Sequence, residues 1–245
     1  MEDMSCSTFL QEISTASSNT PYCIIMSLSR RTVLQHFSFG LPVLDALNRA
    51  LPILAPNFEP YVFNAAGAHK PLPAWKHLLV LQVPSSAAWE ATCHDLSERM
   101  APFVGFTKLP AFPGNEGVPP PSEMLAPARA GVYDAKCTPD TMAVITRARR
   151  MRKNHPILRA IYLVTDSQER ADELAHWLHT DGWDAVYVAS DVHNAWRDLE
   201  IRSMVETEVC RRAGVFVGSG FTTMASNVAL LRTRDLVPPD FTQFW

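Results

Sequence analysis

The segment Gly214–Val228, which reads GVFVGSGFTTMASNV, decides the fold of this 245-residue chain. A run of β-branched and aromatic residues, Val215–Val217, stops at a Gly-Ser-Gly turn, and Thr222 and Thr223 open a stretch with apolar residues at helical spacing. This order predicts a strand, a tight turn and a helix. Glycines let the backbone come close to a ligand, and a helix start presents unpaired N–H groups with a partial positive charge. The segment therefore predicts a phosphate or pyrophosphate site, and the alternative is an ordinary strand–helix joint that binds nothing.

Two common kinds of nucleotide site do not fit the sequence. A dinucleotide fingerprint needs a second strand and an acidic residue about 20 residues later, whereas the residues after Leu231 read RTRDLVPPDFTQFW. A P-loop needs Gly-Lys-Ser or Gly-Lys-Thr at the turn, and this turn contains no lysine. NAD-dependent enzymes and P-loop NTPases are both disfavoured for these reasons.

The composition is that of a globular protein, with 47% hydrophobic and 19% charged residues. The 22 basic and 25 acidic residues leave a net charge of −3, which indicates no nucleic-acid or membrane-surface partner. No apolar run approaches the length of about 18 residues that a membrane span needs. We therefore expect neither a nucleic-acid partner nor a membrane span in this chain.

Targeting and cysteine signals are weak. The N-terminal residues have neither the basic region nor the apolar core of a signal peptide, so the chain as it starts predicts a cytosolic protein. The 5 cysteines include no Cys-x-x-Cys pair, so counting alone predicts buried free thiols and no zinc or other metal site. The basic run Arg147–His155 predicts a solvated helix end, with phosphate binding as the alternative.

Strands and helices alternate along the second half of the chain. Apolar runs predict further strands at His77–Val83, Ala160–Val164 and Ala185–Val188. Apolar periodicity predicts helices at Asp140–Lys153, Gln168–His179 and Leu199–Ala213. This alternation predicts an α/β fold in which a Rossmann-like parallel sheet is flanked by helices.

Ligands of such sheets bind beyond the C-terminal ends of the strands. The predicted strand ends place Thr165–Asp166, Ser190–Asp191 and Gly218–Thr223 on one rim. Outside the alternation, Leu41–Leu54 predicts a helix that ends before Pro56, and Ala68–Trp75 predicts a connection between units. The proline-rich stretch 106–131 predicts no regular element.

The C-terminal half resembles a known family. The stretch VETEVCRRAGVFVGSGFTTMASNVALLR, followed by PPDFTQFW, resembles the C-terminal signature of the GDP-fucose protein O-fucosyltransferase-like proteins, especially their fungal members. AIYLVTDS and DGWDAVYVASD are similar to that family's strand–helix–strand, and the resemblance covers roughly Leu78–Trp245. It implies the C-terminal half of a GT-B glycosyltransferase. Residues 75–245 would be the nucleotide-sugar-binding domain, and residues 1–74 would be a remnant of the N-terminal domain or an extension.

The resemblance also implies roles for particular residues. Thr222 and Thr223 take the place of paired hydroxyls that bind the β-phosphate or pyrophosphate, in one turn with Ser219, Gly220 and Phe221. Glu206 takes the place of an acidic residue that helps to read the nucleotide, and Phe216 and Phe221 would shape the pocket. Thr165 and Asp166 match a Thr/Ser-Asp pair at a strand end; for Asp166, an N-cap of the helix that starts at Gln168 is the alternative.

One departure from the family concerns catalysis. Ser85 and Ser86 stand where the family's basic motif has an arginine pair, one member of which neutralises pyrophosphate charge. A serine hydroxyl cannot replace the permanent, bidentate charge of a guanidinium. Losing such a contact to developing charge costs about 10²–10³ in rate. Arg30 and Arg31 are candidate replacements, with an ordinary surface pair as the alternative.

The resemblance implies inverting transfer of fucose from GDP-fucose to a hydroxyl of a protein or glycan acceptor, with no cofactor besides this donor substrate. Two alternatives stay open: a non-catalytic relative that binds a nucleotide or a partner, and a fragment of a longer enzyme. The family is secretory, which implies the ER or Golgi and a disulfide between Cys93 and Cys137, whereas this chain shows no signal segment.

Overall fold

The computed structural model describes residues 40–54, 73–101, 121–193 and 199–245. Arg30, Arg31 and Pro56, most of the predicted connection at 68–75 and the prolines at 110–120 lie outside these ranges. Everything below refers to the described residues, which belong to one compact unit.

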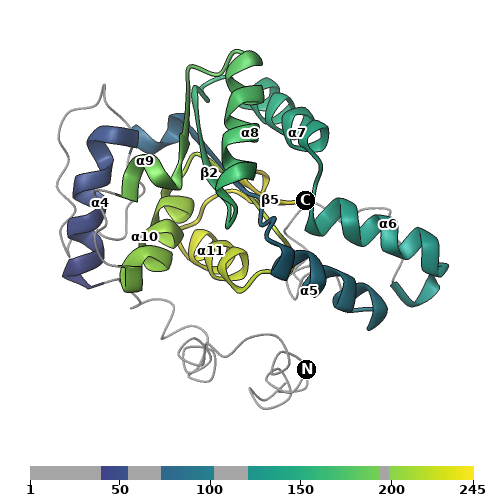
Figure 1. Cartoon of the computed structure of the whole chain (residues 1–245). Helices are drawn as coiled ribbons and strands as arrows, with labels where there is room; N and C mark the ends of the chain where they lie inside the picture. Colours follow the sequence, from purple (N-terminus) through teal and green to yellow (C-terminus); the bar gives the residue numbers. More distant parts are fainter. Residues whose placement is uncertain (1–39, 55–72, 102–120, 194–198) are drawn as a thin grey trace. The chain divides into compact units, whose positions relative to one another are not determined.

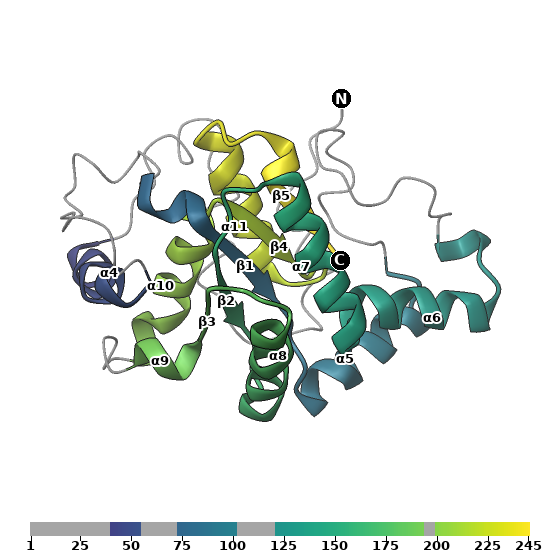
Figure 2. The same ribbon diagram turned by 90° about the horizontal axis from the view of Figure 1, so that it is seen from above.

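Five parallel strands form one sheet in the order β3-β2-β1-β4-β5 (Figure 2). The strands are β1 Leu78–Gln82, β2 Ala160–Val164, β3 Ala185–Val188, β4 Val215–Gly218 and β5 Thr242–Phe244. The predicted parallel α/β sheet is therefore confirmed, with the predicted strands β2 and β3 matching to the residue. The sequence pattern did not predict β5, because three residues are too few to show a strand period.

The described helices surround this sheet in chain order. They are α4 Leu41–Leu54, α5 Ala87–Glu98, α6 Ala126–Cys137, α7 Thr141–Asn154, α8 Gln168–Thr180, α9 Ala189–His193, α10 Leu199–Arg212 and α11 Thr223–Arg234. Short 3₁₀ helices lie at η2 Pro73–His77, η3 Pro121–Glu123 and η4 Pro239–Phe241. The predicted helices α4, α7, α8, α10 and α11 are confirmed.

The prediction of no regular element across 106–131 is wrong at its C-terminal end, where α6 begins at Ala126. Pro127 stands in the first turn of α6, where a helix needs no backbone N–H, so proline opens this helix instead of breaking it. The sequence pattern also did not predict α5, whose described residues include one buried apolar position, Cys93.

Alternate residues of each strand pack against two different layers of helices (Figures 1 and 2). Leu79 and Leu81 of β1 face the layer that contains α7 and α8. Leu78 and Val80 face the layer that contains α4, α10 and α11. The period of two fixes the direction of the next residue, so Gln82 at the end of β1 faces α11.

Two glycines allow close internal packing. A Cβ at Gly214 would meet the carbonyl oxygen of Lys76 at 2.3 Å, and the Gly214 N–H donates to the carbonyl of Trp75 at 2.7 Å. A Cβ at Gly218 would meet the Phe216 ring at 2.7 Å and the Cβ of Ala225 at 2.8 Å. Gly218 therefore lets α11 pack onto the end of β4, and the close approach that its sequence position predicts is made by the protein's own residues.

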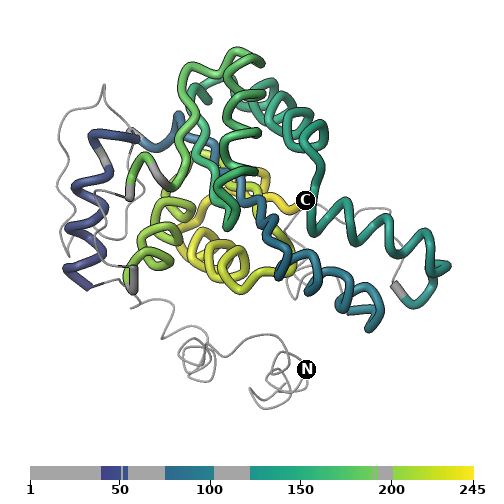
Figure 3. The backbone as a smooth tube through the Cα atoms, viewed as in Figure 1, coloured from purple at the N-terminus to yellow at the C-terminus, as the bar shows by residue number. Residues whose placement is uncertain are grey.

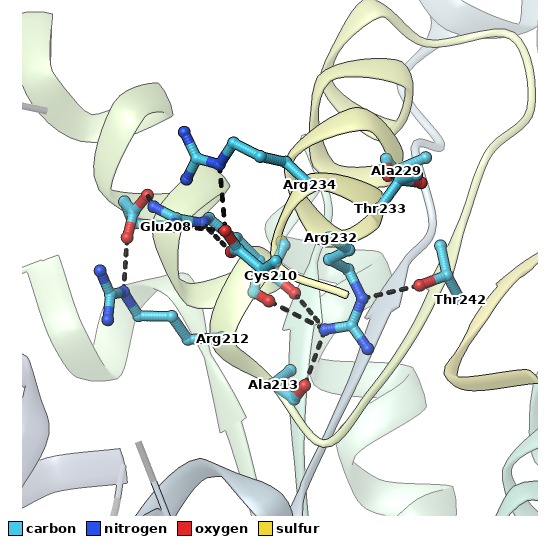
Figure 4. A network of polar contacts seen from close by, with 11 residues as sticks. Glu208, Cys210, Arg212, Ala213, Ala229, Arg232, Thr233, Arg234 and Thr242 are labelled. Atoms are coloured by element: carbon cyan, nitrogen blue, oxygen red, sulfur yellow. Dashed lines mark hydrogen bonds and ion pairs between the residues drawn. The ribbon is translucent and has the colours of Figure 1, made fainter. Parts of the chain in front are cut away.

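Arg232 of α11 is fully buried and links α10, β4 and β5 through its guanidinium (Figure 4). Its nitrogens donate six hydrogen bonds of 2.7–3.2 Å, and none goes to a carboxylate. The acceptors are the carbonyl oxygens of Cys210, Arg211, Ala213, Gly214 and Phe241 and the hydroxyl of Thr242. Two of them belong to the last turn of α10, where carbonyls lack intrahelical partners. Burial lowers the pKa of Arg232 to about 10, so the guanidinium is still charged at neutral pH.

A set of ion pairs lies next to this arginine. Glu208 accepts from Arg211 at 2.6 Å and from Arg212 at 2.5 Å, and Asp235 accepts from Arg211 and Arg234 (Figure 4). Glu208, Arg211 and Arg212 are each less than 4% exposed. Buried charges of this kind are tolerated because each is paired and hydrogen-bonded.

A disulfide joins Cys93 of α5 to Cys137 of α6, as the family resemblance implies. The tube in Figure 3 shows these two helices side by side, and they are in contact. Cys210 is a free thiol buried under α10, as cysteine counting predicts. The disulfide therefore anchors a helix pair that carries part of the rim described below.

The basic run on α7 is engaged within the fold. Arg149 and Arg152 pair with Asp181, and Arg152 also donates to the carbonyl of Gly182 at 2.9 Å. Arg147 donates to Gln243 at 3.1 Å. These contacts explain the clustered arginines as supports of neighbouring loops. Among the described helices, none is both long and apolar enough to cross a bilayer.

Replacing Arg232 by methionine should destabilise the fold by about 3–5 kcal/mol, because buried carbonyls lose their donor. Arg150→Met, at an exposed position of α7, is the matched control and should change stability by less than about 0.5 kcal/mol. Urea unfolding of both variants checks this, and equal losses would contradict the role given to Arg232.

Removing the disulfide should cost roughly 3–4 kcal/mol, because the bond closes a loop in the unfolded chain. The two cysteines are 44 positions apart. The Cys93→Ser/Cys137→Ser double variant tests this by urea unfolding, beside non-reducing peptide mapping of the wild type. A map without a Cys93–Cys137 peptide, or an unchanged unfolding midpoint, would be inconsistent with the bond.

Candidate functional site

The strand order of the described sheet reverses between β1 and β4. The chain leaves β1 toward β2 and β3 on one side and returns to β4 on the other side. Ligands of open α/β sheets bind in the crevice outside such a switch point. Here the crevice lies between the end of β1 at Gln82 and the turn Ser219–Thr222 that joins β4 to α11.

The side chain of Gln82 holds this turn. Its Oε1 accepts from the backbone N–H of Ser219 at 3.2 Å and from the hydroxyl of Thr222 at 3.1 Å. Its Nε2 donates to the Sδ of Met224 at 3.6 Å, which is a weak acceptor. The Thr222 hydroxyl accepts from the N–H of Ala225 at 3.1 Å and so caps α11. Gln82 is 5% exposed, and its contacts fix the turn from inside.

The first turn of α11 retains unused donors. Within the described ranges, the backbone N–H groups of Thr223 and Met224 have no acceptor. Thr223 is exposed, and the Ser219 hydroxyl is buried with no partner among the described residues. The helix end adds a partial positive charge at the same place. These groups together can bind the oxygen atoms of an anion.

Aromatic residues and a lysine lie beside the turn. Phe221 stacks on Tyr133 of α6 with 5.5 Å between ring centroids. The indole Nε1 of Trp245 donates to the backbone carbonyl of Gln82 at 2.7 Å, and Lys136 Nζ donates to the carbonyl of Trp245 at 3.0 Å. Burial raises the pKa of Tyr133 to about 12, whereas burial and the charge of Arg147 lower the pKa of Lys136. The helix α6 thus contributes to the wall of the site.

Thr165, Asp166, Ser85 and Ser86 come together where β1 and β2 end. Asp166 Oδ1 accepts from the backbone N–H of Ser85 at 2.7 Å and of Ser86 at 3.0 Å, and Oδ2 accepts from the Ser86 hydroxyl. The hydroxyls of Ser85 and Thr165 are 3.0 Å apart. The alternative that Asp166 caps α8 is wrong, because Ser167 is the N-cap and accepts from Arg170 N–H. Asp166 instead binds the start of α5.

This arrangement sets the charge at the place where the family motif carries arginines. Ser86 caps α5, and the Asp166 carboxylate lies against the same helix end. The partial positive charge of α5 is therefore already neutralised from within the protein. A phosphate at this end of the site would face a carboxylate instead of a guanidinium.

A cavity of about 340 Å³ opens beside these loops. Its charged lining consists of Glu90, Asp140, Glu169 and Glu173 against Arg170. Arg170 already binds Glu173 at 2.7 Å. The excess of carboxylates does not suit a phosphate, whereas sugar hydroxyls or a cationic group would find acceptors there.

Glu206 lies on α10, away from the groups just described. It is 8% exposed, and its Oε1 accepts from Arg202 at 3.1 Å. Tyr162 and Cys210 are its electrostatic neighbours, and burial raises the pKa of all three side chains. No hydrogen bond or ion pair in the described part of the chain joins Glu206 to the turn. The structure thus brings together Ser219–Thr223 and, separately, Thr165 with Asp166, but not Glu206 with either group.

Three residues of the site were not singled out in the sequence: Gln82, Tyr133 and Trp245. For Gln82 a signal exists, because it is a polar residue in the otherwise apolar strand LLVLQ. For Tyr133 and Trp245 the sequence carries no comparable signal, since each reaches the turn from a segment that is distant along the chain. Phe216 is fully buried beneath the turn. Among the described residues, no group of three or more His, Cys, Asp or Glu side chains could hold a metal ion.

Fold and site together define an α/β domain whose candidate ligand crevice lies at a switch point. No protein-family model and no curated protein sequence match the chain. Solved structures do match it. The crystal structure of POFUT1 in complex with GDP has a TM-score of 0.51 at 11% identity, and the match covers 82% of this chain and 46% of POFUT1. The apo form of POFUT1 gives a TM-score of 0.50 at 12% identity, with the same coverage.

POFUT1 is a GDP-fucose O-fucosyltransferase, and these neighbours are GT-B structures. Identities this low show the fold alone. The chain therefore has a fucosyltransferase-like α/β fold, and it spans less than half the length of POFUT1.

The pH dependence of stability should report the burial of Glu206. Because burial raises the pKa of Glu206, the folded state holds this proton at pH values where the unfolded state has lost it. Wild-type stability therefore decreases as pH rises above about 4.3, the ordinary glutamate pKa, through the folded-state pKa. Glu206→Gln should gain relative to wild type over that window, and urea unfolding at pH 4.5, 5.5, 6.5 and 7.5 measures this.

Ser203→Ala, at an exposed position on the same helix, is the control. It removes no titrating group, so its difference from wild type should not vary with pH. A Glu206→Gln difference that is equally flat would show that this carboxylate is not buried as described.

Proposed function

We propose that this chain is a glycosyltransferase-like domain that binds the diphosphate of GDP-fucose at the start of α11. The observation that carries the proposal is the set of unused donors at the switch point: the N–H groups of Thr223 and Met224 and the hydroxyl of Thr223. The fold it shares with POFUT1, which has been crystallised in complex with GDP, supports the choice of nucleotide.

The reaction that fits this ligand is transfer of fucose to an acceptor hydroxyl. The bond between the fucosyl anomeric carbon and the β-phosphate oxygen breaks, a bond to the acceptor oxygen forms, and the acceptor loses its proton to a base. Negative charge develops on the departing diphosphate, and donors at the start of α11 would stabilise that charge. Reading of the base by Glu206 remains a prediction, because Glu206 is bonded to Arg202 within the protein.

Binding without turnover is the second candidate, and one observation favours it. Asp166 occupies the helix end where a cation would assist departure of the diphosphate, and Ser85 and Ser86 supply no charge there. A domain of this kind would hold a nucleotide sugar or its product without cleaving it.

Nucleotide binding should be detectable as stabilisation against heat. GDP at 100 times its dissociation constant should stabilise the fold by about 2.7 kcal/mol. Scans with GDP, GDP-fucose, UDP and ADP test the base preference, and calorimetry gives the affinity. Thr223→Val should weaken GDP binding about tenfold or more, because a bond to a charged oxygen is lost.

Thr233→Val on the last turn of α11 is the matched control, since its hydroxyl donates to the carbonyl of Ala229 at 2.8 Å. This variant should bind GDP as the wild type does. Absence of a shift with every nucleotide would refute the proposal. If GDP binds, release of GDP from GDP-fucose in the presence of acceptors separates transfer from binding without turnover.

A further inference from the structure

The donors that the turn offers to a ligand are in part already taken by Gln82. Its Oε1 accepts from Ser219 N–H at 3.2 Å and from the Thr222 hydroxyl at 3.1 Å. Both groups lie at the entrance to α11, next to the unused N–H groups of Thr223 and Met224. A single amide oxygen thus stands where a ligand oxygen would accept the same two bonds.

The orientation of the Gln82 amide follows from its partners. A backbone N–H can only donate, so the group that faces Ser219 must be the carbonyl oxygen. The amide nitrogen then faces the sulfur of Met224 at 3.6 Å, where it is poorly satisfied. Gln82 therefore gains from the two bonds at Oε1 and gains little at Nε2, and its present position depends on the turn being without a ligand.

An anionic oxygen is a stronger acceptor than an amide oxygen. Hydrogen bonds to ionised groups are roughly twice as strong as those between neutral groups. A phosphate oxygen can therefore displace Gln82 Oε1 from both donors, whereas a neutral sugar hydroxyl gains nothing by doing so. The result is discrimination for charged ligands, at the cost of some affinity for all of them.

We propose that Gln82 is a gate of the anion site, whose side-chain oxygen occupies Ser219 N–H and the Thr222 hydroxyl until a phosphate oxygen displaces it. The proposal rests on the proposed function, because the displacing group is the diphosphate that α11 binds. Gln82 acts through the turn and is a specificity-determining residue. Its backbone carbonyl, which accepts from Trp245, takes no part in the gate.

Substitutions at Gln82 test the gate by calorimetry with GDP and with guanosine. Gln82→Met has a similar shape without the acceptor oxygen, and it should bind GDP about tenfold tighter, because two net hydrogen bonds no longer compete. Gln82→Glu keeps the acceptors and adds a charge, and it should bind GDP about tenfold more weakly. Guanosine, which has no phosphate, should bind all forms equally.

Gln243→Met is the matched control. Gln243 lies on β5 and bonds to Arg147 and to the carbonyl of Asp240, not to the turn. Its GDP affinity should equal that of wild type. Amide hydrogen exchange gives a second readout on the folded, unliganded protein: exchange at Ser219 should be faster in Gln82→Met than in wild type.

The outcomes separate the gate from the function on which it rests. If wild type binds GDP and Gln82→Met binds it equally or more weakly, the gate is overturned and the nucleotide site stands. Parallel changes for GDP and guanosine would show a merely structural role and overturn the gate as well. If neither wild type nor Gln82→Met binds GDP, both proposals are overturned. Should Gln82→Met not fold, Gln82→Glu decides, because unchanged GDP affinity in that variant also overturns the gate.

Discussion

The buried guanidinium of Arg232 is the constraint on which the C-terminal half of the fold depends. It supplies donors to carbonyls that the end of α10 cannot satisfy, and it bonds to Gly214 at the start of β4 and to Thr242 at the start of β5. Helix end, strand start and edge strand are thereby fixed to one planar group. The chain then runs along β5 to Trp245, whose indole reaches the carbonyl of Gln82. The geometry of the candidate site thus depends on an arginine that lies outside it.

The two helix starts at the rim are treated differently, and this difference bears on function. The start of α5 is filled by the carboxylate of Asp166, a full charge from the protein itself. The start of α11 is filled in part by a neutral amide, and its first N–H groups stay without an acceptor. An external anion would have to compete with a carboxylate at α5 but only with an amide at α11. Electrostatics therefore favours α11 as the place for a phosphate.

The sequence allows the sheet and most of its helices to be predicted, because buried parallel strands are short apolar runs and the helices between them are amphipathic. It does not reveal α5 and α6 in the same way, since α6 begins at Ala126 beside a proline and α5 buries little apolar surface. Thr222 could be predicted as a helix start because capping is local. The partners of Asp166 could not, because its bonds to Ser85 and Ser86 cross 80 residues or more.

The turn between β4 and α11 is held from three directions that are remote in sequence. Gln82 reaches it from β1, Tyr133 stacks on Phe221 from α6, and α6 is itself tied to α5 by the disulfide. A ligand oxygen that replaces Gln82 Oε1 would change only the first of these contacts. The stacking and the disulfide can therefore keep the turn in place while the amide moves. This separation of a movable side chain from a fixed backbone allows one residue to set the selectivity of the site without altering the fold around it.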